Sequence, residues 1–248
     1  MFRYIVASIF LLVIVLIKKI PPPDKKDFLW FFLSGAMGFT IYVITFNLGA
    51  QTVSVATSSI IIATTPVLTA LAASFIFREK INKKEWLAIV IEFIGVIVIC
   101  AFEGILTFNL GILWILVAAL SFSIYNIVLR KLKGKYTPIQ ITAYSIFAGT
   151  LLLLLFLPKV FHELKYSVWQ ANASVIIMGV FCSGIGYLLW SKALALAKRT
   201  SEVTNYLFLS PLLTTMLGVF TLWEIPNLST WLGGAIIMIG MILFEKGK

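Results

Sequence analysis

The stretch ATTPVLTALAASFIFREKINKKEWLAIVIEFIGVIVI (residues 63–99) is matched later in the chain by LSPLLTTMLGVFTLWEIPNLSTWLGGAIIMIGMIL (residues 209–243). One offset of 145 residues, which also relates Tyr42 to Tyr187, aligns every matched pair without a gap. The identical pairs are Tyr42/Tyr187, Pro66/Pro211, Glu79/Glu224, Asn82/Asn227, Trp86/Trp231 and Gly95/Gly240. Composition bias does not produce this many identities in one register, so the sequence predicts a duplicated unit.

The composition is typical of a membrane protein. Hydrophobic residues make up 60% of the chain and charged residues 12%, and the mean hydropathy is +1.03. A soluble domain needs more charge to cover its surface, so we expect the apolar surplus to face lipid. Nine segments are apolar and long enough to be membrane-spanning helices: residues 2–17, 28–47, 53–77, 86–102, 110–129, 139–157, 173–195, 203–222 and 231–244. The predicted fold is an all-α polytopic membrane protein with nine transmembrane helices in this chain.

The net charge of +10 follows a pattern that predicts orientation in the membrane. Four Lys or Arg follow each of the first, third and fifth predicted helices, two follow the seventh, and two lie at the C-terminus. All of these connections fall on one side of the membrane, and short basic loops remain in the cytoplasm. Arg3 is one of the few basic residues on the other side. The sequence therefore predicts the cytoplasmic (inner) membrane, a cytoplasmic C-terminus and no binding of nucleic acid.

The repeat divides the chain into residues 1–102 and residues 110–244. The second to fourth predicted helices correspond to the seventh to ninth, and the first corresponds to the sixth, but residues 110–129 have no partner. A complete unit therefore has five helices, and an odd number inserts the two copies in opposite directions. The prediction is an inverted five-plus-five helix repeat with the first helix missing. A helix preceding Met1, or a second protomer in a homodimer, would supply the missing wall.

The duplicated proline, glutamate, tryptophan and glycine resemble the EamA-type branch of the drug/metabolite transporter superfamily. The most specific part is residues 63–99 and 209–243, and the resemblance covers residues 2–244. It implies a secondary transporter that moves a small organic metabolite, such as an amino acid or a related amphiphile, across the lipid bilayer by alternating access, with export as the expected direction. The alternatives are a non-transporting membrane scaffold or incomplete fragment and, less favoured, a lipid-processing membrane enzyme.

Catalytic and metal chemistry have little support in the sequence. The chain contains one His and two Cys, both Cys lie in apolar segments, and there is no glycine-rich nucleotide-binding loop. A membrane enzyme would need acid–base or metal-binding groups. We therefore predict no enzyme activity, no cofactor and no metal site.

Pro66 and Pro211 are candidate hinges because they lie near the middle of their predicted helices. A proline removes one helical hydrogen bond and leaves a carbonyl oxygen that a neighbouring group must satisfy within a membrane. The recurrence of the proline in both repeats favours a bend that flexes during transport. The alternative is a static packing kink.

Aromatic and hydroxyl residues on single helical faces are candidates for the lining of the solute cavity. Such faces offer an amphiphilic organic solute aromatic contact and a few hydrogen bonds. The candidates are Phe39, Tyr42, Phe46, Ser58, Thr65, Trp114, Ser121, Tyr125, Ser183, Tyr187, Trp190 and Ser210. The alternative is that the aromatic rings pack between helices and the hydroxyls bond to their own helix.

Two charged residues within predicted helices are candidates for coupling. Glu92 is the acidic residue deepest in a span, and an intramembrane carboxylate is a functional candidate for proton coupling. The family resemblance favours a supporting role instead, because it places the helix of Glu92 at the periphery. Lys192 lies near the cytoplasmic end of its helix, where it would either reach toward the headgroups or attract an anionic carboxylate.

Overall fold

The computed structural model describes residues 2–53, 58, 61–101, 110–156, 169–210, 213 and 228–247. Every named element within these ranges is a helix. Four helical stretches are long and apolar enough to cross a bilayer: Lys25–Ala50, Leu110–Leu132, Pro138–Phe156 and Trp169–Leu196. Two shorter apolar helices, Phe2–Ile17 and Thr65–Phe77, accompany them.

The described helices group into two compact units that cut across the sequence repeats. Unit 1 comprises Met1–Val43 and Ile124–Ala197, and unit 2 comprises Ile44–Ser123 and Lys198–Lys248. Each unit therefore combines residues from both halves of the sequence. Helix α7 (Leu110–Leu132) contributes to both units.

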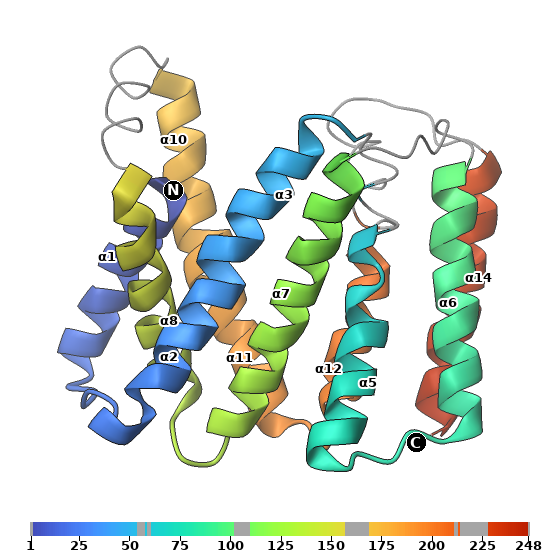
Figure 1. Ribbon diagram of the computed structural model, residues 1–248, viewed down its shortest axis with the longest axis horizontal. Helices are drawn as coiled ribbons and strands as arrows, with labels where there is room; N and C mark the ends of the chain where they lie inside the picture. The colour runs from blue at the N-terminus through green and yellow to red at the C-terminus, as the bar shows by residue number, and fades with distance from the viewer. Residues whose placement is uncertain are drawn as a thin grey trace. The chain divides into compact units, whose positions relative to one another are not determined.

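Unit 1 contains helix α1 (Phe2–Ile17; Figure 1), whose apolar residues recur at intervals of three and four. Tyr4, Ala7, Leu11 and Val15 are buried on this face, the spacing of one side of an α-helix. Helix α1 packs against η4 and α8, and α8 also packs against α2, η2 and α11. The elements of this unit are α1 (Phe2–Ile17), η1 (Lys25–Asp27), α2 (Phe28–Gly35), η2 (Ala36–Ile41), α8 (Pro138–Leu153), η3 (Leu154–Phe156), α10 (Trp169–Ile177), η4 (Met178–Gly186) and α11 (Tyr187–Leu196), together with the end of α7 and the start of α3 (Tyr42–Ala50).

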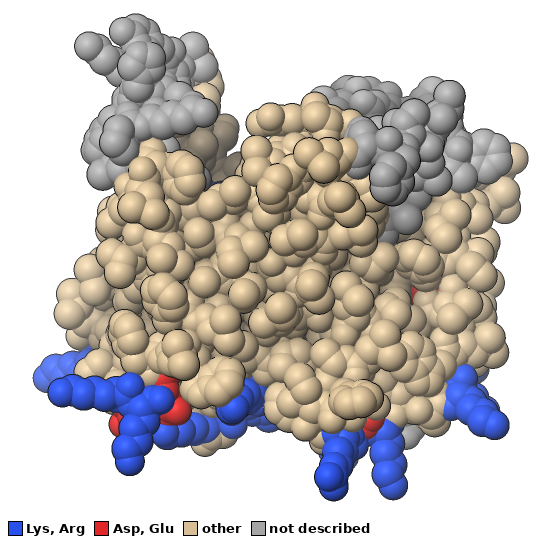
Figure 2. Space-filling view, viewed as in Figure 1, with Lys and Arg blue, Asp and Glu red and all other residues tan. Residues whose placement is uncertain are grey.

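Charged residues gather at one end of unit 1 (Figure 2). Lys135 pairs with Asp24 at 3.0 Å and with Asp27, and hydrogen bonding to Asp27 and then to Asp24 raises the pKa of Lys135 above its ordinary value. At the same end, Arg130 donates a hydrogen bond to the carbonyl oxygen of Ala197 at 3.1 Å. These contacts hold the connections between helices together.

Unit 2 has its tightest packing between α6 (Lys83–Ala101) and α14 (Leu228–Gly247). The two helices are antiparallel, because Asn82, just before α6, donates a hydrogen bond to the carbonyl oxygen of Gly247 at 2.5 Å. A Cβ atom on Gly95 would lie 2.8 Å from the carbonyl oxygen of Gly233 and 2.7 Å from Ile237, so only glycine permits this approach. The other elements of this unit are α5 (Thr65–Phe77), α12 (Thr200–Thr204) and η5 (Asn205–Phe208), together with most of α3 and the start of α7.

The structure corrects the expected place of Pro66. The sequence predicts a proline in mid-helix, but residues 63–64 form a turn and Pro66 lies in the first turn of α5. A proline fits there because the first N–H groups of a helix need no intrahelical partner. The carbonyl oxygen of Ile61 accepts hydrogen bonds from the Thr64 hydroxyl at 2.6 Å and the Thr64 backbone N–H at 3.0 Å.

The eighth predicted span also differs from expectation where the structure describes it. Residues 203–222 were expected as one helix, but the segment begins with the end of α12 and the tight 3₁₀ turn of η5. Pro211, Glu224 and the linker 103–109 lie outside the described residues.

Candidate functional site

The Phe39 ring contacts three other aromatic rings in unit 1, and the four rings come from four different helical elements. The ring centroid of Phe39 lies 5.5 Å from that of Tyr4, 5.4 Å from that of Tyr125 and 4.8 Å from that of Tyr187. The Tyr125 and Tyr187 centroids are 6.0 Å apart. Most of these pairs meet edge to face, the favourable geometry for aromatic rings. We call Tyr4, Phe39, Tyr125 and Tyr187 the aromatic cluster.

Two π-helical segments aim side chains into this cluster. Phe39 lies within η2, and Tyr187 immediately follows η4. A π-helical turn inserts an extra residue and rotates the residues after it, and such turns are frequent at functional sites. Tyr42 follows η2 as Tyr187 follows η4, so the two repeat-related tyrosines occupy equivalent places after a π-helical segment.

Arg3 adds a positive charge to the aromatic cluster. Its guanidinium donates a hydrogen bond to the Tyr4 hydroxyl at 2.8 Å, and its central carbon lies 4.8 Å from the centroid of the Tyr4 ring. Tyr42 and Tyr187 are close enough to interact electrostatically with the guanidinium. In the part of the chain that the structure describes, no carboxylate forms an ion pair with Arg3.

Hydroxyl groups tie the neighbouring helices of unit 1 to one another. The Ser34 and Ser145 hydroxyls are hydrogen-bonded at 2.5 Å, and the Thr142 hydroxyl donates to Ser191 at 2.8 Å. Thr40 donates to the carbonyl oxygen of Gly149 at 3.0 Å. Such bonds are characteristic of packed helices in membranes. They fix the elements that carry the aromatic rings.

The structure brings three of the sequence-predicted cavity residues together, Phe39, Tyr125 and Tyr187. Tyr42 follows η2, three residues after Phe39. Two further candidates lie nearby in sequence on η4 and α11. Ser183 is buried, and the Trp190 indole N–H donates to the Asn126 side-chain oxygen at 2.8 Å.

The other six candidates belong to unit 2 and take individual positions there. Ser58 and Thr65 are buried, Trp114 and Ser210 are exposed, and the Ser121 hydroxyl donates to the carbonyl oxygen of its own helix at Val117. Phe46 lies in α3 and is half-buried. These residues are not gathered into one cluster as the unit 1 residues are.

Sequence reasoning missed Arg3 and Tyr4 as site residues. The signal for Tyr4 was available, because Tyr4, Ala7 and Leu11 recur on one helical face. Arg3 was counted only as a charge at a helix end. Its neighbour Tyr187 lies far along the chain, and no local pattern joins the two residues.

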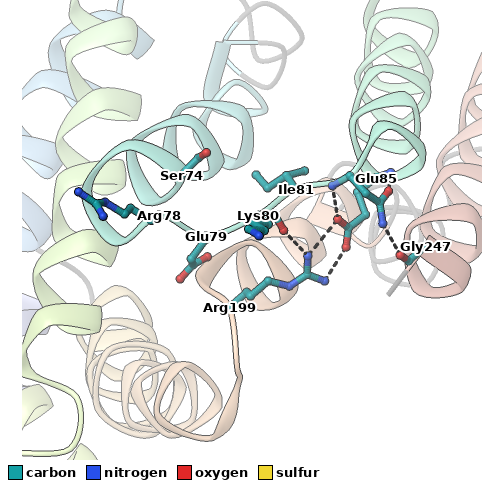
Figure 3. Close-up of a pocket in the computed structure, with 9 residues that line it drawn as sticks. Ser74, Arg78, Glu79, Lys80, Ile81, Glu85, Arg199 and Gly247 are labelled. Atoms are coloured by element: carbon teal, nitrogen blue, oxygen red, sulfur yellow. Dashed lines mark hydrogen bonds and ion pairs between the residues drawn. The ribbon is translucent and has the colours of Figure 1, made fainter.

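A second polar region occupies one end of unit 2 (Figure 3). Arg199 donates to the Glu85 carboxylate at 2.5 and 2.9 Å, to Glu202 at 3.1 Å and to the carbonyl oxygen of Lys80 at 2.9 Å. Hydrogen bonding to Glu85 raises the pKa of the Arg199 guanidinium above its ordinary value. We call Glu79, Glu85, Arg199 and Thr200 the charged clasp.

The rest of the charged clasp joins α12 to the end of α5. The Glu79 carboxylate accepts the backbone N–H of Thr200 at 2.8 and 3.0 Å and the Thr200 hydroxyl at 2.9 Å. A groove of about 730 Å³ runs beside these residues and is also lined by the exposed side chains of Arg78 and Lys80. Because the carboxylates already have protein donors, the clasp is built to hold segments together.

The two coupling candidates have different surroundings. Glu92 is fully buried in α6, and its carboxylate accepts the Asn205 side-chain N–H at 3.0 Å. Lys192 is exposed on α11, four residues before that helix ends at Leu196. Both residues remain candidates that transport measurements must separate.

Comparison with known proteins identifies the relatives of this chain. Residues 1–101 and residues 109–245 each match the EamA-like transporter family. The uncharacterized transporter YdfC of Bacillus subtilis is 31% identical over 249 residues, which cover 100% of this chain and 81% of that protein. A probable terminal-alkyne amino-acid exporter of Streptantibioticus cattleyicolor is 27% identical over 244 residues, covering 98% of this chain and 82% of that protein.

A solved crystal structure has a similar fold. It aligns with a TM-score of 0.81 over 98% of this chain and 86% of the solved chain, at 15% sequence identity. At this level of identity the similarity concerns the fold alone.

Proposed function

This chain belongs to the EamA-like transporter family, and we propose that it moves a small organic solute with an apolar or aromatic body by alternating access. The family and the named relatives make it a multi-pass membrane transporter and not an enzyme. The observation that carries the solute proposal is the aromatic cluster, where rings, phenol hydroxyls and one guanidinium converge within unit 1.

An inverted repeat is the proposed basis of alternating access, and the contacts of α6 with α14 support it. Gly95 contacts Ile237, and Gly240 contacts Glu92. The repeat offset relates Gly95 to Gly240 and Glu92 to Ile237. Replacing both residues of the Gly95–Ile237 contact by their repeat partners therefore gives the Gly240–Glu92 contact. Exchanged contacts between antiparallel helices are what a two-fold axis in the membrane plane produces.

The proposed architecture is an inverted five-plus-five helix repeat, to which this chain contributes nine transmembrane helices. The separate family matches to residues 1–101 and 109–245 support two copies. The clustering of Lys and Arg at one end of each unit supports a cytoplasmic location for that end, and hence a cytoplasmic C-terminus in the cytoplasmic membrane (Figure 2). A homodimer is also part of this proposal.

The proposed solute is an amino acid or a related amphiphile, and the proposed direction is export. The similarity to a probable amino-acid exporter supports both choices. We also propose that the break before Pro66 is a hinge, since the turn at residues 63–64 already interrupts the helix. Pro211 would have the same role in the second repeat.

Transport by purified protein in proteoliposomes tests this function directly. Labelled aromatic and aliphatic amino acids are loaded inside, and efflux is compared with that from protein-free vesicles. Tyr187→Ala should reduce transport, whereas Tyr144→Ala is the matched control. Tyr144 is a tyrosine of the same unit that packs on Phe31 and Phe147 outside the aromatic cluster. Folded protein that moves no organic solute would favour the scaffold alternative.

A further inference from the structure

We infer that Arg3 binds the anionic group of the transported solute, and that this group is a carboxylate. The inference rests on the proposed function and deepens it, because it names the chemical group that the site selects. It also assigns a binding role to a residue whose position in the sequence suggests only a helix-end charge.

The first argument is that Arg3 has more hydrogen-bond donors than the described residues use. A guanidinium carries five N–H donors and no acceptor. Within the described residues, the hydrogen-bond acceptor of Arg3 is the Tyr4 hydroxyl, at 2.8 Å. The Arg3 side chain is partly buried, where water competes for its donors less effectively than in bulk solvent.

The second argument comes from the other described arginines. Arg199 is matched by Glu85 and Glu202, and Arg130 donates to the carbonyl oxygen of Ala197. Arg78 is exposed to solvent. Arg3 differs from them because it is partly buried against tyrosine rings without a carboxylate partner in the described chain. A charge placed within a membrane protein at such a cost is a candidate for ligand binding.

The third argument concerns the shape of the ligand that would fit. Arginine binds carboxylates through two parallel N–H···O bonds, and the Tyr4 ring beneath this guanidinium lies 5.5 Å from Phe39 in the aromatic cluster. The rings of Phe39 and Tyr187, 4.8 Å apart, provide an apolar wall beside it. One cation beside aromatic rings suits a single carboxylate on an organic body better than a doubly charged phosphate.

Binding of matched ligands to full-length purified protein tests the inference. The probes are phenylalanine and leucine, each paired with its amide, which keeps the side chain and amino group but lacks the carboxylate. For the wild type we expect the acids to bind about 10- to 100-fold more tightly than the amides, as for a hydrogen-bonded charged group. Arg3→Gln should lose that preference and leave affinity for the amides unchanged, and Arg3→Lys should retain part of it.

Arg78→Gln is the matched control, because it removes an exposed arginine and should change neither affinity. Thermal unfolding and gel filtration of each variant show whether it is folded. If Arg3→Gln is folded and still prefers the acids, the inference about Arg3 is wrong while the proposed transport of organic solutes stands. If the wild type binds the amides as tightly as the acids, the carboxylate assignment and the role of Arg3 are both wrong, while binding of organic solutes stands. If the folded wild type binds none of the four compounds, both the solute class and the role of Arg3 are wrong.

Discussion

Arg3 and Arg199 show how the same side chain serves two purposes in one molecule. In the charged clasp of unit 2, Arg199 donates to two carboxylates and a backbone carbonyl oxygen. In the aromatic cluster of unit 1, Arg3 donates to one phenol hydroxyl and lies over its ring. Among the described residues, one guanidinium is therefore satisfied by carboxylates, and the other keeps donors that we assign to a ligand.

This difference predicts which substitutions lower the stability of the protein and which lower its affinity for solute. Removing a member of a satisfied buried network leaves its partners unpaired, and this lowers the free energy of unfolding. Removing a group whose partner is a solute changes affinity and has little effect on folding. We expect substitutions in the two regions to divide along this line.

The largest expected effect is on the stability of unit 2. Arg199→Ala leaves the fully buried Glu85 carboxylate without its ion-pair partner, and we expect a loss of about 3 kcal/mol in the free energy of unfolding. Thermal unfolding of purified protein in detergent measures it. Arg3→Ala is the comparison and should leave the melting temperature nearly unchanged. Equal losses for the two variants would contradict the distinction between clasp and cluster.

The next effect tests close packing in unit 2. Gly95→Ala places a methyl group 2.8 Å from a backbone oxygen of α14, and neither helix can yield without separating. We expect a loss of about 1–3 kcal/mol in the free energy of unfolding, as for overpacked cores, measured by the same unfolding assay. Gly186→Ala is the control, because its nearest contact would be an ordinary 3.4 Å. A stable Gly95→Ala variant would mean that α6 and α14 are less tightly packed.

A smaller effect is expected on binding in the aromatic cluster. Tyr187→Ala removes the ring that lies 4.8 Å from Phe39 and should weaken apparent solute affinity about tenfold. Tyr187→Phe keeps the ring and should lose about threefold through the missing hydroxyl. Tyr42→Ala should behave in the same direction. Unchanged affinity in folded alanine variants would assign these tyrosines to packing.

The smallest effect is expected at Glu92. Glu92→Gln keeps an oxygen that can accept the Asn205 N–H, so we expect folding, transport rate and the pH dependence of transport to be retained. The pH dependence is measured in proteoliposomes with and without an imposed proton gradient. A loss of gradient-driven transport in this variant would instead assign Glu92 to proton coupling.

Sequence reasoning located several helices closely where hydropathy changes abruptly. Helix α1 has the predicted bounds, and α7 begins at Leu110 as predicted and ends three residues later at Leu132. The prediction was less successful where local backbone geometry departs from the α-helix. The turn before Pro66 and the 3₁₀ turn of η5 interrupt segments that are uniformly apolar, and hydropathy does not register such interruptions.

The candidate site was predicted in part for a related reason. Repetition singled out Tyr42 and Tyr187, and helical spacing added Phe39 and Tyr125. Neither signal could reveal that Tyr4 and Arg3 complete the cluster, or that Arg199 pairs with Glu85. These contacts join residues that are distant in sequence and that share no motif.

The sequence by itself determined that the chain is a helical membrane protein with a duplicated pattern and a known family relationship. Transfer of apolar side chains into lipid is a sum over a local segment, so composition and length decide it. Only the tertiary structure decided that Arg199 pairs with carboxylates while Arg3 lies over a tyrosine ring. Contacts between helices depend on the rotation and register of each helix. In this protein, π-helical turns and close glycine contacts help to set both.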